Sequence, residues 1–175
     1  MQKIMMVCIA ALAMLAPVAL AEESSTEAAY RSVAQAQDMF AINGTDAFEQ
    51  ISGSDMFDPF VFVLGTDDFV TVASSDFPEL EGEGTFDPSQ AGYTRESLLE
   101  HLGECDGLWL LHHFEPEPGV VLAEMLWLSE MGGYVFASGF FLPDLNLPEW
   151  LQAWYDEQLK TMVRLLNVAA GCECA

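Results

Sequence analysis

Five apolar runs of strand length, separated by turn-forming residues, are the strongest constraint on how this 175-residue chain folds. They cover residues 60–64, 69–73, 108–114, 120–129 and 134–141. The connections at residues 65–68, 116–119 and 132–133 are short and rich in Gly, Pro and Asp, as hairpin turns are. The pattern therefore predicts antiparallel strands.

Helical periodicity flanks and interrupts these runs. We expect helices at residues 22–42, at 45–50, from 94 to about 103, and from 148 onward. Asn43-Gly44 is a suitable helix stop, because both residues tolerate the left-handed conformation that a C-cap needs. Thr45 and Thr94 precede the next two helices and are candidate N-caps. The last helix is amphipathic, so it is expected to dock on protein.

The order of these elements predicts an α+β fold. Its centre is a five-stranded antiparallel sheet with helices packed on one side: a long N-terminal helix, a covering helix and loop, and the C-terminal amphipathic helix. The covering loop, residues 74–91, is long, polar and broken by Gly and Pro. A loop of this length in a small domain is more often functional than not.

The charge of the chain excludes several partners. There are 5 Lys and Arg against 28 Asp and Glu, a formal charge of −23. Nucleic acids and anionic lipid surfaces both need clustered basic residues, so neither is expected. The chain is 51% hydrophobic, with 12 Phe, 4 Trp and 4 Tyr, and it should therefore fold rather than remain disordered.

The first 21 residues resemble a secretory signal peptide. Lys3 precedes an apolar run, and Ala19-Leu20-Ala21 supplies the small-x-small cleavage pattern. Removal of residues 1–21 would leave a domain at 22–145 and a C-terminal helix with a Cys-x-Cys tail at 146–175. No later apolar stretch is long enough to cross a bilayer, so we expect a periplasmic or secreted product without membrane insertion after cleavage.

Three cysteines remain after cleavage: Cys105, Cys172 and Cys174. In an oxidising compartment Cys105 is expected to pair with one of the other two, which would tie the C-terminal tail to the covering helix. The leftover thiol is then free to link two chains. A Cys172–Cys174 bond is a further alternative, and the sequence does not choose among them.

Catalytic and metal-binding patterns are weak. No Gly-x-Ser-x-Gly elbow and no Asp-x-Asp-x-Asp-Gly calcium loop is present. His101 and Cys105 would share a helical face. His112 and His113 would point to opposite faces of a strand, so they are not expected to bind one metal ion together. We therefore expect no catalytic residue, no metal site and no cofactor.

The best candidate site is a group of aromatic and polar residues. It comprises Trp109, His112, Trp127 and Tyr134 in adjacent strands, and Tyr93 and Arg95 at the start of the covering helix. A helix and loop lying over one sheet face would make these residues a largely apolar ligand pocket. Arg95 would be a bidentate carboxylate clamp. The alternative is that the aromatic residues are core and that Arg95 pairs with Glu96 or Glu100.

Several strings, taken in order, resemble a single Cache domain, an extracellular ligand-sensing module with a PAS-like fold. They lie at residues 43–48, 60–63, 107–116 and 127–141, and the similar stretch covers about residues 29–141. There are departures: residues 67–69 and 73–75 replace the family's small-Asp-Gly and Ala-His-Pro strings, and His112 replaces a usual tyrosine.

The resemblance implies an exported small-molecule-binding domain of sensor type without catalytic activity. Its ligand would be a small molecule such as a carboxylate or an amino acid, and ligand occupancy would pass to a membrane sensor. Association of two copies of the chain into a homodimer is a further expectation. The alternative is a ligand-free interaction or dimerisation module of the cell envelope.

Overall fold

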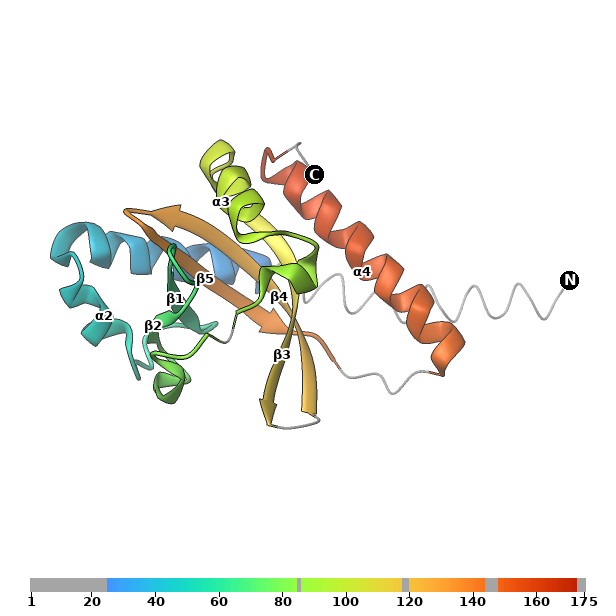
Figure 1. The fold of residues 1–175 in the computed structure, drawn as a ribbon, viewed down its shortest axis with the longest axis horizontal. Coiled ribbons are helices and arrows are strands. Elements are labelled where there is room, and N and C mark those ends of the chain that lie inside the picture. Colours follow the sequence, from blue (N-terminus) through green and yellow to red (C-terminus); the bar gives the residue numbers. More distant parts are fainter. Residues whose placement is uncertain (1–24, 85, 118–119, 144–147, 173–175) are drawn as a thin grey trace, which may run out of the picture.

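The computed structural model describes residues 25–84, 86–117, 120–143 and 148–172. It has five strands: β1 Val61–Gly65, β2 Thr71–Ser74, β3 Leu108–Glu117, β4 Val120–Met131 and β5 Tyr134–Phe141. The sheet order is β2-β1-β5-β4-β3, and every neighbouring pair is antiparallel (Figure 1). The predicted α+β class and five-stranded sheet are confirmed.

The helices also lie close to their predicted positions. The chain is helical over residues 25–43, followed by α2 Asp46–Ile51, α3 Arg95–Glu104 and α4 Glu149–Ala169. Thr94 begins α3 with a capping box, in which its hydroxyl accepts from the Ser97 N–H. Thr45 precedes α2 but makes no side-chain cap bond, so its predicted capping role is wrong.

Helices cover both faces of the sheet, and the expectation that they pack on one side is wrong. The helix at 25–43 covers one face, which we call the helix face, and α3 covers the opposite face, the roof face. The reason is in β4, where residues 125–128 are all apolar and all buried. Because strand side chains alternate, such a run has two apolar faces that must both be covered.

The predicted loop between β2 and α3 contains two short 3-10 helices, η1 Pro78–Leu80 and η2 Pro88–Ala91. We call the connection, residues 75–84 and 86–93, the roof segment. It is hydrogen-bonded to both edge strands of the sheet, β2 and β3. The Thr71 N–H donates to the Glu83 carbonyl at 3.0 Å, and the His113 N–H donates to Gln90 Oε1 at 3.2 Å.

The edge strand β3 is covered by α4. Asn167 near the end of α4 is buried, and its side-chain amide bonds to both backbone groups of Trp109, accepting from the N–H at 2.6 Å and donating to the C=O at 2.9 Å. A side chain thus takes the place of a neighbouring strand. No helix in the described ranges is both long and apolar enough to cross a bilayer.

Candidate ligand pocket

A small pocket lies between the roof segment and the roof face of the sheet. Phenylalanines make up half of its lining residues, and the rest include one buried acid and one histidine. The lining residues are Phe60, Phe62, Thr71, Ser74, Phe77, Leu80, Phe86, His112, Glu124 and Phe141. Its volume is about 30 Å³, enough for one or two water molecules. We call it the roof pocket.

His112 and Glu124 are the polar centre of this pocket. They are directly opposite each other on β3 and β4, and His112 Nδ1 lies 2.7 Å from Glu124 Oε1. Both side chains are about 95% buried or more. The Phe86 ring lies over the imidazole, with ring centroids 5.0 Å apart. A pair held this closely and shielded from water has a fixed orientation.

The other ring nitrogen of His112 makes no hydrogen bond to any residue that the structure describes. Nε2 is buried and is unpaired among the described residues. An unsatisfied buried polar atom costs about 1–3 kcal/mol of stability, so such atoms are uncommon in folded proteins. In a pocket lined by His112, an unpaired Nε2 is the atom that a bound molecule would satisfy.

The predicted site residues do not form one pocket. Trp109, Trp127 and Tyr134 lie on the helix face, whereas His112 lies on the roof face. Residues three apart in a strand point to opposite faces, so Trp109 and His112 could not have shared a pocket on one face. The expectation of a pocket bordered by both tryptophans and His112 is therefore wrong.

The helix-face aromatic residues pack as core. The ring centroids of Trp109 and Trp127 are 5.6 Å apart, and Tyr30 from the N-terminal helix lies 4.1 Å from Trp127. Tyr134 packs against Phe48 of α2 at 4.8 Å. Close contacts between aromatic rings of this kind stabilise the fold.

Tyr93 and Arg95 lie outside the roof pocket. Tyr93 is half-buried beside His101, with ring centroids 5.4 Å apart, and burial raises the pKa of its phenol. The Arg95 guanidinium donates to the Asp67 carbonyl and lies 3.6 Å from Glu96. The predicted carboxylate clamp is thus bonded to the chain itself and does not line the pocket.

Sequence reasoning missed Glu124 and Phe86. Phe86 sits in a polar loop, and no periodicity marks it. Glu124 did carry a signal, because it is the single charged residue in the apolar run at 120–128. A lone acid in a buried strand needs a partner, and a histidine on the neighbouring strand is a natural one.

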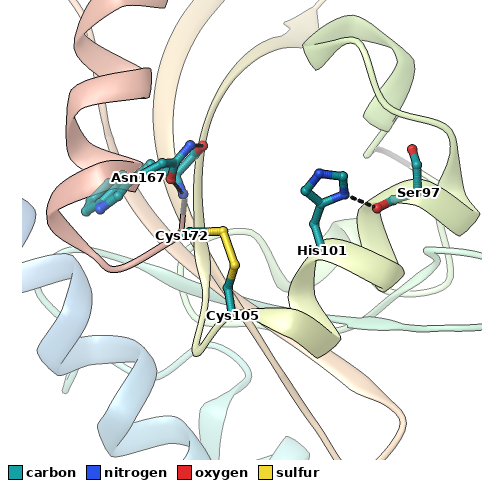
Figure 2. The surroundings of a disulfide bond; sticks show 6 residues. Ser97, His101, Cys105, Asn167 and Cys172 are labelled. Carbon is teal, nitrogen blue, oxygen red and sulfur yellow. Dashed lines mark hydrogen bonds between the residues drawn. A yellow bond between two sulfur atoms is a disulfide. The ribbon is translucent and has the colours of Figure 1, made fainter. Parts of the chain in front are cut away.

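A disulfide joins α3 to the C-terminal turn. Cys105 at the end of α3 bonds to Cys172, two residues before Cys174, which lies outside the described residues. Figure 2 shows this bond, with Asn167 on the neighbouring turn of α4 and His101 bonded to the Ser97 carbonyl on α3. One of the two predicted pairings of Cys105 is therefore present. Disulfides of this kind persist in oxidising compartments.

A second, larger cleft of about 580 Å³ lies between η2 and α4, over the edge of β3. We call it the edge cleft. Tyr93 and Trp109 line it, together with His113, Lys160 and Arg164. No group of three potential metal ligands occurs in the part of the chain that the structure describes.

Comparison with known proteins finds structures of similar fold at low sequence identity. No family model and no curated protein matches the sequence. The fold is similar to a methyl-accepting chemotaxis protein from Vibrio parahaemolyticus, at 11% identity and a TM-score of 0.49, over 74% of this chain and 94% of that one. It is also similar to the periplasmic sensor domain of a chemotaxis protein, at 18% identity and a TM-score of 0.45, over 74% of this chain and 99% of that one.

A third similar structure is a Rhodobacter sphaeroides LOV protein, at 15% identity and a TM-score of 0.39, over 56% of this chain and 68% of that one. Similarities this remote identify neither a ligand nor a partner for the chain.

Proposed function

We propose that the chain is an exported, non-catalytic domain of sensor type that binds a small molecule in the roof pocket. The observation that carries this proposal is the buried, unpaired Nε2 of His112 in an aromatic pocket. A ligand with one polar group and a small apolar body would satisfy that atom and contact the phenylalanines at the same time. The fixed His112–Glu124 pair supplies orientation.

The size of the pocket requires the roof segment to move when a ligand enters. A volume of about 30 Å³ holds one or two water molecules, less than a small organic molecule needs. Gly82 and Gly92 lie in the roof segment and both adopt a left-handed conformation with φ of 86°. Glycine tolerates such backbone angles without strain, so these positions can change conformation as the segment is displaced.

The proposed signal follows from what the roof segment is attached to. It leads directly into α3, and the disulfide from Cys105 to Cys172 links α3 to the end of α4. Displacement of the roof by a ligand would therefore alter both α3 and α4. A ligand shifts the conformation in this way only if it binds the displaced state more tightly than the closed one. We propose that a membrane sensor protein recognises the altered surface of α3 and α4.

One observation favours the alternative, an interaction or dimerisation module. Trp154, Leu165 and Val168 of α4 are 42%, 65% and 57% exposed. An α4 that contacts a second chain through these residues would need no ligand at all. Sedimentation at increasing protein concentration measures this self-association directly.

The experiment that tests ligand binding is a thermal shift against acetate, propionate, alanine and methylamine, with His112→Phe as the variant. A ligand that binds only the folded state raises Tm, and the rise should be lost in the variant. Trp109→Phe is the matched control, because it changes an aromatic residue on the opposite face. A rise that persists in His112→Phe would refute the roof pocket as the site. No rise for any compound, combined with concentration-dependent dimers, would favour the module.

A further inference from the structure

On the exposed edge of β3, one residue between two bonded neighbours has both its N–H and its C=O unpaired among the described residues. In an antiparallel pair, alternate residues of an edge strand point their N–H and C=O away from the neighbouring strand. Over residues 108–113 of β3 these are Trp109, Leu111 and His113. Asn167 takes both groups of Trp109, and Gln90 takes the N–H of His113. Leu111, between them, has no edge partner among the residues described.

This unpaired residue lies in the edge cleft. Leu111 lines the cleft, with Gln90 and Gly92 of the roof segment on one side and α4 on the other. The volume of about 580 Å³ falls within the roughly 300–1,000 Å³ of small-molecule sites. The cleft therefore has room for a ligand beside an N–H and a C=O that are free to bond with it.

Charges of opposite sign lie along the α4 wall of the cleft. Arg164 has no ion-pair partner within the described ranges, and Asp156 lies eight residues earlier on the same helix. At 1.5 Å per residue this separation is about 12 Å along the helix axis. Lys160 lies between them and pairs with the exposed Glu157 at 3.7 Å. Arg164 is thus the cation available to a ligand.

We propose that the edge cleft binds a short peptide with free ends, about three residues long. Three extended residues span about 10 Å, close to the separation of the two charges. The carboxylate would bind Arg164, the ammonium group would bind Asp156, and the middle residue would exchange two hydrogen bonds with Leu111. This is strand addition to a sheet edge, limited to one residue.

The direction of the bound peptide follows from the packing. α4 runs opposite to β3, since Asn167 near its end contacts Trp109 near the start of the strand (Figure 1). A peptide with its carboxylate at Arg164 and its ammonium at Asp156 would then run antiparallel to β3. Antiparallel pairing gives the two mutual bonds that Leu111 can make. A zwitterion also carries no net charge, so the −23 charge of the chain does not repel it.

The first test uses trialanine and the full mature chain. Calorimetry should detect binding, and blocking either end, as N-acetyl-trialanine or trialanine amide, should weaken it by about tenfold or more, since each block removes one charge-assisted contact. N-methylation of the middle amide should weaken it as well. No heat of binding for trialanine, or equal affinity for the blocked peptides, would overturn the proposal.

A second test locates the site on the protein. Trialanine should slow hydrogen exchange of the Leu111 amide by about tenfold or more, and should leave the His113 amide, already bonded to Gln90, almost unchanged. Arg164→Gln should weaken binding by about tenfold, while Arg31→Gln, the same change on the N-terminal helix, should not. Binding without protection of Leu111, or equal losses in both variants, would overturn the assignment. The proposal is independent of the roof pocket, because His112→Phe should leave trialanine binding intact.

Discussion

The Cys105–Cys172 disulfide should contribute a large part of the stability of this domain. The bond closes a loop with a sequence separation of 67 residues. In the chain-entropy treatment, a cross-link of that length lowers the entropy of the unfolded chain enough to stabilise the folded state by about 4 kcal/mol at 25 °C. Domains of this size are stable by only about 5–15 kcal/mol, so loss of the bond should leave a weakly stable fold.

The perturbation is the double variant Cys105→Ala/Cys172→Ala, studied by urea unfolding with tryptophan fluorescence. The free energy of unfolding should fall by about 4 kcal/mol and Tm by roughly 8–16 °C. Wild-type protein under reducing conditions should behave like the variant. The urea m-value should rise in both, because an unfolded chain without the cross-link exposes more surface.

Cys174→Ala is the matched control and should leave the free energy of unfolding unchanged. A bond from Cys105 to Cys174 would close a loop of nearly the same length, so stability alone does not separate the two pairings, whereas the control does. Loss of stability in Cys174→Ala would show that the tail pairs differently in solution. A fall of less than about 1 kcal/mol in the double variant would refute the entropic argument.

Three further predictions concern the edge of β3, two glycines and the half-buried phenol of Tyr93. Asn167→Ala should lower the free energy of unfolding by about 2–4 kcal/mol, because it removes two buried hydrogen bonds. Gln90→Ala removes an exposed hydrogen bond to the same edge and should lower it by less than about 1 kcal/mol. Equal losses in urea unfolding would show that burial of the hydrogen bonds does not set their contribution. Gly139→Ala places a Cβ 2.0 Å from a backbone oxygen of β4 and should lower the free energy of unfolding by about 3 kcal/mol or more. Gly103→Ala, which has open space around it, should stabilise α3 by about 0.5–1 kcal/mol. Both changes are measured as shifts in Tm. Burial raises the pKa of Tyr93, so its contribution to stability is present below pH 10 and is lost as pH rises through the raised pKa. In an absorbance titration, Tyr93→Phe should remove one phenol that ionises at higher pH than a free tyrosine. An unchanged titration would refute the raised pKa.

Local sequence signals were enough to place most elements of the fold. Gly44 adopts a φ of 61° at the end of the first helix, and the turn between β4 and β5 uses Gly132 and Gly133 at φ of 63° and 84°. Thr94 caps α3 through Ser97 three residues later. Each of these signals acts within four or five residues, so an isolated sequence contains it.

The candidate site was harder to predict because it depends on contacts between distant segments. Strand alternation alone separates Trp109 from His112, yet it does not say which face the roof segment covers. The bond from Arg95 to the Asp67 carbonyl joins residues 28 positions apart, and no local pattern signals it. Asn167 likewise reads as an ordinary helical residue until α4 is docked against β3.

The covering of β3 also blocks one route by which copies of this acidic domain could associate. Free sheet edges are templates on which another chain can extend the sheet, and that is a common route to aggregation. Here two side-chain amides, from Asn167 and Gln90, occupy the positions that a foreign strand would use on either side of Leu111. A long strand of a second molecule would have to displace both. Extension of the sheet along this part of β3 is therefore blocked, while the N–H and C=O of Leu111 stay unpaired among the described residues.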